Sequence, residues 1–436
     1  MPFPNIIRLA PIGPVSAEIR IPGSKSITNR AFVIAALADG LSILNAPLLS
    51  DDTEVMSKCL TDLGISIDIL PEDRTIIAGS GGEFVCPSSA LFAGNSGTTI
   101  RFLAAAASLA PQGCSVILDG IARMRQRPIV GLIDAMQQLG VTAAASATGC
   151  PPVTVDGGGI RGGACLIEGT MSSQYLSALL MVSPYAAEDV EIEVHGDLVS
   201  KPYVDMTLSM MADFGVTATN NNYRSFTIPA GQRYLGREYD VEPDASNASY
   251  FFSAAAVTGG LVTVEGLGTL SMQGDIHVVD VLEQMGCSVL REASSTTVSG
   301  PSELKPIDFD ASSIPDMAQT IAVVAAFAAG PSRLTGLKTL RVKETDRIAA
   351  MAKELRKIGS TVTEGSDYLI IQPGLTKAAA IDTYDDHRMA MSFAVAGLKI
   401  DDLIINDPGC VSKTFPDFWT RWSGAFPNTL LDEANV

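Results

Sequence analysis

The sequence predicts a mixed α/β protein of two domains, each built from three copies of one repeating unit. A length of 436 residues exceeds one ordinary hydrophobic core. Apolar Ala-rich helices alternate with short strands, and a helix end closed by glycine and entering a strand recurs along the chain. These glycines lie about 71 to 76 residues apart, which indicates an internal repeat; they are Gly64, Gly140, Gly215, Gly286 and Gly359.

Each copy is expected to contain a short alternating strand, a polar loop, an apolar helix, a turn and a second strand. The sixth copy lacks the glycine signature, and we expect its missing strand to come from "VSAEIRI", which starts at Val15. Three copies per domain assign residues 1–23 and 242–436 to domain I and residues 24–241 to domain II. The helices of the six copies are predicted to begin near Ser26, Ser96, Ser172, Asn247, Asp316 and Asp386.

Composition excludes several classes of protein. A net charge of −18 opposes a broad nucleic-acid surface, so any bound anion needs a locally basic site. The apolar runs are too short to cross a bilayer, and the start of the chain has no secretory pattern, so we expect a cytoplasmic protein and, by default, a monomer. The seven scattered cysteines are expected to be reduced, and three distant histidines leave little for a zinc site.

Polar residues gather at the predicted helix starts, whereas the helix interiors carry few charges. Helix amino termini favour anions, and Ser, Thr, Asp or Asn there are often only caps. Capping does not explain cations, which are disfavoured by the helix dipole at this end unless a bound anion compensates their charge. Lys25, Arg30, Arg101 and Arg388 are therefore the strongest candidates for anion binding.

Further basic groups lie in "RMRQRP" from Arg123 and in "RVKETDR" from Arg341. In the second stretch, Lys343 and Arg347 share a helix face beside Glu344, although a solvated ion-paired face explains the pattern equally well. Lys413 precedes the last helix, and "VSKPY" places Ser200 and Tyr203 at the matching point of the third copy. Neither "GSKS" nor "GGGIRG" has the spacing or context of a nucleotide-binding motif.

Nine motifs in order along the chain resemble the 5-enolpyruvylshikimate-3-phosphate synthase family. The resemblance implies an enolpyruvyl-transferase fold (an inside-out α/β barrel): two domains, each of three βαβαββ repeats, with the active site in the cleft between them. It implies transfer of the enolpyruvyl group of phosphoenolpyruvate to the 5-hydroxyl of shikimate 3-phosphate, without metal or organic cofactor. The motifs are "PGSKSITNR", "GNSGTTIR", "RMRQRP", "SSQY", "VSKPY", "IPDMAQTIA", "RVKETDR", "DDHRMAM" and the stretch from Asp407 to Phe418.

The resemblance also implies roles for single residues. Asp316 matches the proton acceptor, and either Glu344 or Lys25 supplies a proton. The shikimate 3-phosphate contacts implied are Lys25, Ser26, Arg30, Ser172, Ser173, Gln174, Ser200, Tyr203, Asp316 and Lys343. Those for phosphoenolpyruvate are Lys25, Asn95, Gly97, Arg123, Gln174, Arg347, Arg388 and Lys413, and His387 and Thr339 are weaker candidates.

Alternative functions are less compatible with these residues. Thr339 stands where the family often has Asn. Ser96, Thr99 and Phe102 depart from the usual second motif, so the sequence leaves sensitivity to the inhibitor glyphosate open. Gly97, which is retained in that motif, favours sensitivity. A transferase acting on UDP-N-acetylglucosamine shares fold and donor, but typically has Lys-Asn in the first motif and often a loop cysteine. An RNA-end cyclase would need a nucleotide motif and a basic surface, and a non-catalytic metabolite-binding repeat protein would not need the full residue set.

Overall fold

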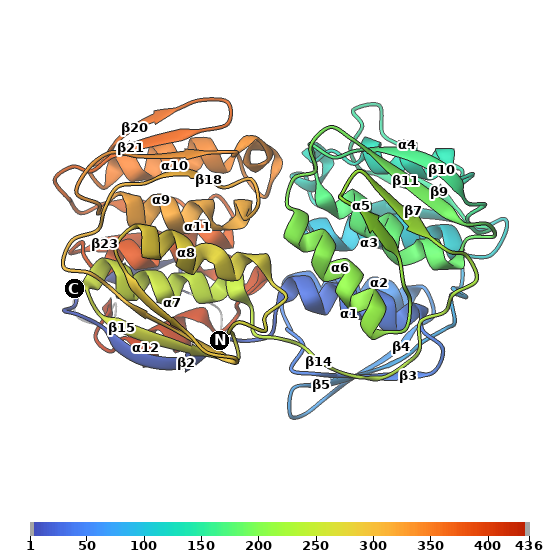
Figure 1. The fold of residues 1–436 in the computed structure, drawn as a ribbon, viewed down its shortest axis with the longest axis horizontal. Helices are drawn as coiled ribbons and strands as arrows, with labels where there is room; N and C mark the ends of the chain where they lie inside the picture. The colour runs from blue at the N-terminus through green and yellow to red at the C-terminus, as the bar shows by residue number, and fades with distance from the viewer. Residues whose placement is uncertain (1–3, 432–436) are drawn as a thin grey trace. The chain divides into compact units, whose positions relative to one another are not determined.

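The computed structural model describes residues 4–431 and divides into two compact units. Unit 1 comprises Met1–Pro22 and Glu242–Val436, and unit 2 comprises Gly23–Val241. Within the described part of the chain, each unit contains three four-stranded sheets, one for each predicted copy. The predicted enolpyruvyl-transferase fold of six α/β copies is confirmed, and Figure 1 shows how helices and strands alternate within each unit.

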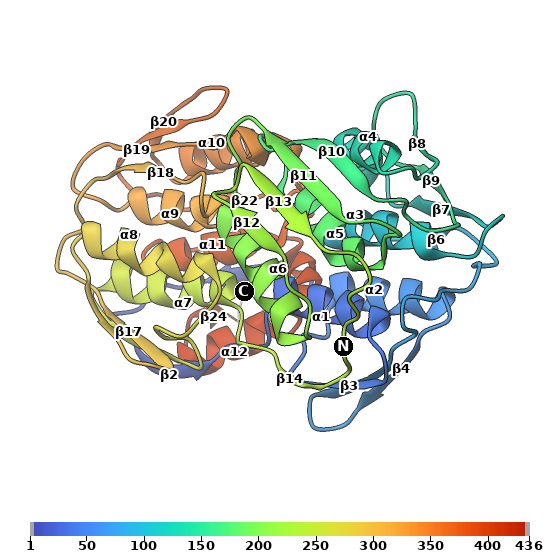
Figure 2. The same cartoon turned by 45° about the vertical axis from the view of Figure 1, so that its right-hand side comes forward.

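The sheets of unit 2 share one pattern, in which the first two strands are parallel and the others are antiparallel. Alternating burial, as at Val116 and Leu118, turns one face of each sheet toward the helices. Figure 2 brings the sheet of the third copy into view beside α6 (Lys201–Asp213). The strands, in sheet order, are β14 (Glu238–Asp240), β3 (Leu41–Asn45), β5 (Arg74–Ala78) and β4 (Ser66–Leu70); β6 (Leu91–Phe92), β7 (Ser115–Asp119), β9 (Val153–Asp156) and β8 (Ala143–Ala145); β10 (Gly163–Glu168), β11 (Val190–His195), β13 (Ser225–Ile228) and β12 (Thr219–Asn221).

Unit 1 repeats this pattern, but its amino-terminal strands correct one prediction. "VSAEIRI" forms β2, which pairs with β15 of the fourth copy; the sixth sheet is completed instead by β1 and β24. The missing strand thus comes from the amino terminus, but from the segment before the predicted one. The sheets are β2 (Ser16–Arg20), β15 (Leu261–Glu265), β17 (Ser295–Ser299) and β16 (Ser288–Arg291); β18 (Asp308–Asp310), β19 (Ser332–Thr335), β21 (Leu369–Gln372) and β20 (Thr361–Glu364); β22 (Ala380–Ile381), β23 (Leu403–Asn406), β1 (Ile6–Leu9) and β24 (Leu430–Leu431).

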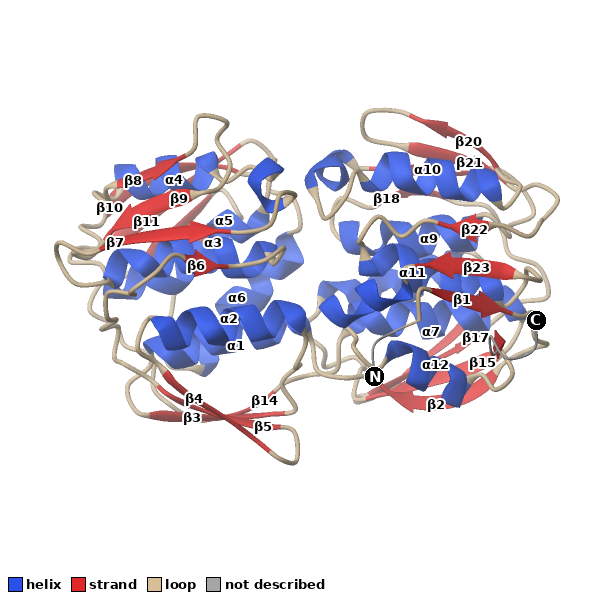
Figure 3. Cartoon of the chain, turned by 180° about the vertical axis from the view of Figure 1, so that it is seen from behind, coloured by secondary structure: helices blue, strands red, loops and turns tan. Residues whose placement is uncertain are grey.

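One nearly uncharged helix from each copy forms the centre of its unit, and the predicted starts are confirmed to within two residues. In unit 1 these helices pack against one another with every residue buried, and the views from the front and from behind show the sheets around them (Figures 1 and 3). The central helices are α1 (Lys25–Leu37), α3 (Gly97–Ala106) and α5 (Ser173–Val182) in unit 2, and α7 (Ala245–Thr258), α9 (Ala318–Ala325) and α11 (His387–Gly397) in unit 1.

The second helix of each of the first five copies ends at a signature glycine. All five glycines have positive φ, between 87° and 107°, so the left-handed closure predicted from sequence is confirmed. The sixth copy instead has a 3₁₀ helix, Pro408–Lys413, followed by α12 (Phe418–Ala425). The other second helices are α2 (Asp51–Asp62), α4 (Val130–Gln138), α6 (Lys201–Asp213), α8 (Val278–Gln284) and α10 (Arg347–Lys357).

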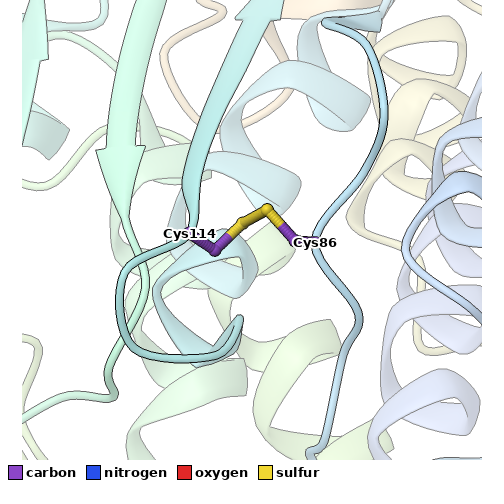
Figure 4. Close-up of a disulfide and its surroundings, with 2 residues drawn as sticks. All are labelled: Cys86 and Cys114. Carbon is purple, nitrogen blue, oxygen red and sulfur yellow. A yellow bond between two sulfur atoms is a disulfide. The ribbon is translucent and has the colours of Figure 1, made fainter.

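The expectation that all seven cysteines are reduced is wrong for two of them. Cys86 and Cys114 form a disulfide that ties the loop before β6 to the turn before β7 (Figure 4). The two residues are 28 positions apart and belong to different copies, so nothing in their spacing pointed to a pair. The other five cysteines are free and buried, as expected.

Between residues 4 and 431, no helix is both long and apolar enough to cross a membrane.

Candidate active site

The candidate residues of unit 2 lie at the starts of its helices. Lys25 is the first residue of α1, and its Nζ lies 3.2 Å from Oδ2 of Asp52. Asp52 is buried in the first turn of α2, where a capping box between Ser50 and Thr53 fixes the backbone. A buried carboxylate thus orients the Lys25 ammonium, and the contact comes from the neighbouring helix of the same copy.

Arg30 lies one turn further along α1 and is only 1% exposed. Its guanidinium donates to the carbonyls of Ser26 and Tyr203, at 2.9 and 3.1 Å, and to the hydroxyls of Thr207 and Ser177, at 2.8 and 3.3 Å. It forms no ion pair with a carboxylate of the described residues. Burial lowers the pKa of Arg30 to about 10, with a smaller opposing contribution from Tyr203. This is a cation held by neutral groups, which an anionic ligand would stabilise.

Two buried arginines surround Gly97, the first residue of α3. Arg101 Nη1 donates to the Gly97 carbonyl at 3.1 Å and to Gln174 Oε1 at 2.9 Å. Arg127 Nη1 donates to the backbone carbonyl and to the side-chain oxygen of Asn95, at 2.9 and 3.3 Å. A Cβ built on Gly97 would lie 2.6 Å from Arg127 Nη2 and 2.7 Å from Arg101 Nη1. The structure thus joins Asn95, Gly97 and Gln174 through two guanidiniums.

The remaining candidates of unit 2 occupy other helix starts and one loop. Ser172 caps α5 by accepting a hydrogen bond from the Gln174 amide, and Ser173 is buried beside it. Ser200 precedes α6 with a left-handed φ of 55°, and Tyr203 lies in the first turn of that helix. Arg123 is half-buried in the loop after β7 and donates to Gln126 at 3.3 Å.

In unit 1, Asp316 is the centre of a network of charged side chains. It lies in the 3₁₀ helix Pro315–Met317 that leads into α9. Its Oδ2 accepts from Arg388 Nη2 at 2.9 Å, and its Oδ1 lies 3.1 Å from Arg347 Nη1 and 3.5 Å from Lys343 Nζ. Burial raises the pKa of Asp316, but the three cations outweigh it and hold that pKa well below its ordinary value. Asp316 is therefore ionised.

Arg347 links three carboxylates in this network. It is 1% exposed and contacts Asp386 through Nε at 2.7 Å and Glu344 through Nη2 at 2.9 Å, in addition to Asp316. Burial alone lowers the pKa of Arg347, but the three carboxylates raise it above its ordinary value. Asp386 also caps α11 by accepting from the backbone N–H of Arg388 at 3.0 Å, so one carboxylate contacts both the Arg347 guanidinium and the backbone from which the Arg388 side chain extends.

Three further candidates of unit 1 lie outside this set of ion pairs around Asp316. His387 is fully buried, with Nδ1 at 3.7 Å from Asp386 Oδ1. Lys413 is buried at the end of the 3₁₀ helix Pro408–Lys413, and Asn247 of α7 donates to the carbonyl of the next residue, Thr414, at 3.1 Å. Thr339 is half-buried in the 3₁₀ helix Lys338–Val342, before Lys343.

Sequence reasoning missed the partners that orient the cations. Asp52 and Asp386 are not among the site residues predicted from the sequence, although Asp386 marks a predicted helix start. Arg127 lies in the quoted motif "RMRQRP", of which only the first arginine was nominated. The separation of four residues between Arg123 and Arg127 would indicate a shared face only in an α-helix, and this stretch is the 3₁₀ helix Met124–Gln126, after which Arg127 is extended. In the described part of the chain, no group of three His, Cys, Asp or Glu residues is arranged to hold a metal ion.

Comparison with known proteins gives the same assignment over nearly the whole chain. The family model of EPSP synthase (3-phosphoshikimate 1-carboxyvinyltransferase) matches residues 9–422. The 3-phosphoshikimate 1-carboxyvinyltransferase of Nostoc punctiforme is 49% identical over 94% of this chain and 96% of its own. The chloroplastic enzyme of Arabidopsis thaliana is 46% identical over 95% and 83%, respectively.

Solved structures support the assignment. EPSP synthase from Acinetobacter baumannii has a TM-score of 0.82 at 26% identity and covers 98% of this chain and 99% of its own. The enolpyruvyl transferase NikO from Streptomyces tendae, at 17% identity and a TM-score of 0.73 over 95% and 96% of the two chains, shares the fold. The chain belongs to the EPSP synthase family and is a transferase that moves the enolpyruvyl group of phosphoenolpyruvate to the 5-hydroxyl of shikimate 3-phosphate.

Proposed function

We propose that residues of both units carry out this transfer, with unit 2 anchoring shikimate 3-phosphate and unit 1 supplying the base. The observation that carries the proposal is the Asp316 carboxylate held by Arg347, Arg388 and Lys343. Both substrates then lie in a cleft between the units, and we expect the units to approach each other on binding, which small-angle X-ray scattering with and without substrates measures.

Shikimate 3-phosphate is proposed to bind mainly through unit 2. Arg30 is a buried cation with neutral partners, and the phosphate would supply the missing countercharge. The start of α5 offers hydroxyls and backbone N–H groups, which suit a phosphate. Lys343 and Asp316 would reach the same substrate from unit 1. The other contacts proposed are Lys25, Ser26, Ser172, Ser173, Gln174, Ser200 and Tyr203.

Phosphoenolpyruvate is proposed to bind to cations from both units. Arg347 and Arg388 would hold one of its anionic groups, since the Arg347 guanidinium is already oriented by Asp386 and the Arg388 guanidinium by Asp316. Gly97 would let the phosphoenolpyruvate approach the backbone of α3 closely. The other contacts proposed are Lys25, Asn95, Arg123, Gln174 and Lys413, with His387 and Thr339 as weaker candidates.

Asp316 is proposed to take the proton of the 5-hydroxyl while that oxygen attacks C2 of phosphoenolpyruvate. Its three cations keep it ionised but make it a weak base in the free protein. Phosphoenolpyruvate would draw Arg347 and Arg388 toward its own negative charge, which raises the pKa of Asp316 and strengthens it as a base. Substrate binding would thus activate the acceptor at the moment it is needed.

The methylene carbon of phosphoenolpyruvate must gain a proton as the C2–O bond forms, and lose one as phosphate leaves. Glu344, 2.9 Å from Arg347, and Lys25, 3.2 Å from Asp52, are the two proposed donors. Solvent deuterium entering the methylene group during turnover distinguishes them, because replacing the true donor, as in Glu344→Gln or Lys25→Met, should slow that exchange more than it weakens binding.

The test is phosphate release from the purified protein with shikimate 3-phosphate and phosphoenolpyruvate, compared with UDP-N-acetylglucosamine as acceptor. We expect release only with shikimate 3-phosphate, and a fall in kcat of about 10²–10⁴-fold in Asp316→Asn, the range for loss of a general base. Asp346→Asn is the control, because the contacts of Asp346 within residues 4–431 are its cap on α10 and its pair with Arg341. Equal kcat in wild type and Asp316→Asn would contradict the proposed base.

We also propose that the enzyme is cytoplasmic and monomeric and that it binds glyphosate. Because disulfides are rare in cytosolic proteins, the state of Cys86 and Cys114 in freshly extracted protein tests the cytoplasmic location. Thiol titration of protein extracted under alkylation tests whether the cysteines are reduced. Analytical ultracentrifugation tests whether the protein is a monomer, and competition between glyphosate and phosphoenolpyruvate tests whether glyphosate binds.

A further inference from the structure

The loop between β22 and α11 contains a tight turn made by residues that seldom adopt its conformation. The Asp386 amide donates to the Thr383 carbonyl at 3.0 Å, and the two residues between them, Tyr384 and Asp385, have φ of 57° and 54°. Two positive φ values in succession are typical of a type I′ turn, which favours Gly and Asn. A tyrosine in this conformation is strained and persists only when its surroundings hold it there.

The group that holds the turn is Glu354, a carboxylate with no exposed surface on α10. Its Oε1 accepts a hydrogen bond of 2.5 Å from the Tyr384 hydroxyl. Its Oε2 accepts from the Asp382 amide at 3.1 Å and from Lys357 Nζ at 2.6 Å. Burial and the hydrogen bond to Glu354 raise the pKa of Tyr384, so the phenol stays protonated and donates at neutral pH. One buried carboxylate therefore contacts the residue before the turn, Asp382, and the second residue of the turn, Tyr384.

Helix α10 also contacts the last residue of the turn, Asp386. Arg347, the first residue of α10, contacts Asp386, and Glu354, two turns later, contacts Tyr384. Two turns of helix separate these contacts by about 10 Å. Asp386 in turn accepts a hydrogen bond from the backbone N–H of Arg388. The position of Asp386 therefore depends on how α10 holds the turn, and with it the position of the Arg347 guanidinium and of the backbone from which the Arg388 side chain extends.

We propose that Tyr384 and Glu354 are positioning residues that fix Asp386 and thereby set the geometry of the Arg347–Arg388 pair for an anionic substrate group. Neither side chain needs to touch the substrate. The inference rests on the proposed binding of phosphoenolpyruvate by Arg347 and Arg388. Loosening the turn would let both guanidiniums move, and would weaken that substrate's binding while leaving the shikimate 3-phosphate groups of unit 2 intact.

The test is the kinetics of Tyr384→Phe, which removes one oxygen and keeps the ring under Lys353 Nζ, 5.3 Å from its centroid. We expect KM for phosphoenolpyruvate to rise about five- to tenfold, with kcat and KM for shikimate 3-phosphate within twofold of wild type. Tyr223→Phe is a matched control, because Tyr223 also donates to a carboxylate, that of Asp205 at 2.8 Å, and also lies under a lysine, Lys201 at 5.2 Å. Its KM for phosphoenolpyruvate should not change.

A second variant separates tethering from backbone strain. Tyr384→Gly adopts positive φ without cost but has no tether, so we expect its KM for phosphoenolpyruvate to equal or exceed that of Tyr384→Phe. Wild-type KM in either variant, or a fall in thermal stability alone, would overturn the inference. Arg388→Lys is measured in parallel: if it too leaves that KM unchanged, the proposed phosphoenolpyruvate site has failed and this inference with it.

Discussion

Arg30 in unit 2 and Arg347 in unit 1 are equally buried, but their surroundings are opposite. Arg30 is held by hydroxyls and carbonyls, and its pKa falls to about 10, because burial dominates. Arg347 also loses hydration, but its three carboxylates raise its pKa. A cation with neutral partners gains most from an anionic ligand, whereas a neutralised cation holds carboxylates in place. This difference supports the proposed division into anchoring by unit 2 and proton transfer by unit 1.

The largest expected effect on stability separates these two arginines directly. Arg347→Met removes a buried cation from contact with Asp386, Glu344 and Asp316, of which the first two are buried, and should lower the unfolding free energy of unit 1 by about 3–5 kcal/mol. Arg30→Met should cost unit 2 only about 1 kcal/mol, because Thr207 and Ser177 keep each other as partners at 2.9 Å. Both tryptophans, Trp419 and Trp422, lie in unit 1, so their fluorescence during urea unfolding reports that unit, while circular dichroism reports both. Equal losses of unfolding free energy in Arg347→Met and Arg30→Met would contradict the proposed difference between the two arginines.

The disulfide gives the next largest effect and belongs to unit 2. Cys86→Ser should lower the stability of unit 2 by about 3.5 kcal/mol, the value expected when a loop of this length is released. We expect the circular dichroism transition to move and the tryptophan transition to stay. Reductant should reproduce the loss in wild type and add nothing in the variant; a further loss there would show that the disulfide is not its cause.

Gly97 tests how closely the two guanidiniums of unit 2 enclose the start of α3. In Gly97→Ala the new methyl would press on Arg101 and Arg127, at 2.7 and 2.6 Å, besides crowding phosphoenolpyruvate or glyphosate. We expect KM for phosphoenolpyruvate to rise about tenfold, equivalent to about 1.4 kcal/mol. Gly131→Ala, whose Cβ would meet Tyr175 only at 3.4 Å, should leave it unchanged. Unchanged KM and glyphosate inhibition in Gly97→Ala would contradict the expected crowding.

The smallest effect concerns Gln319, one turn after Asp316 on α9. It is 1% exposed, and neither amide atom has a hydrogen-bond partner among residues 4–431. A buried unpaired amide costs about 1–3 kcal/mol, so Gln319→Met should stabilise unit 1 by about 1 kcal/mol and shift the tryptophan transition to higher urea. A shift to lower urea would show that the amide has a stabilising partner.

The starts of the central helices and the five closing glycines follow from local sequence, because caps and left-handed turns are set by neighbouring residues. The partners of the cations do not. Asp52 meets Lys25, and Asp386 meets Arg347, only when the tertiary fold brings the starts of two successive helices together. The pairing of Cys86 with Cys114 likewise depends on the tertiary fold. The alternating residues of β2 predict a strand, but they do not indicate which sheet the strand joins.

Shikimate 3-phosphate binding, measured by calorimetry in Arg30→Met and Asp316→Asn, tests the division between the units most directly. We predict that Arg30→Met loses affinity about a hundredfold, since a buried charge-assisted contact disappears. Asp316→Asn should keep affinity within about tenfold of wild type while phosphate release falls by about 10²-fold or more. Equal loss of affinity in both variants, or turnover retained in Asp316→Asn, would contradict the account.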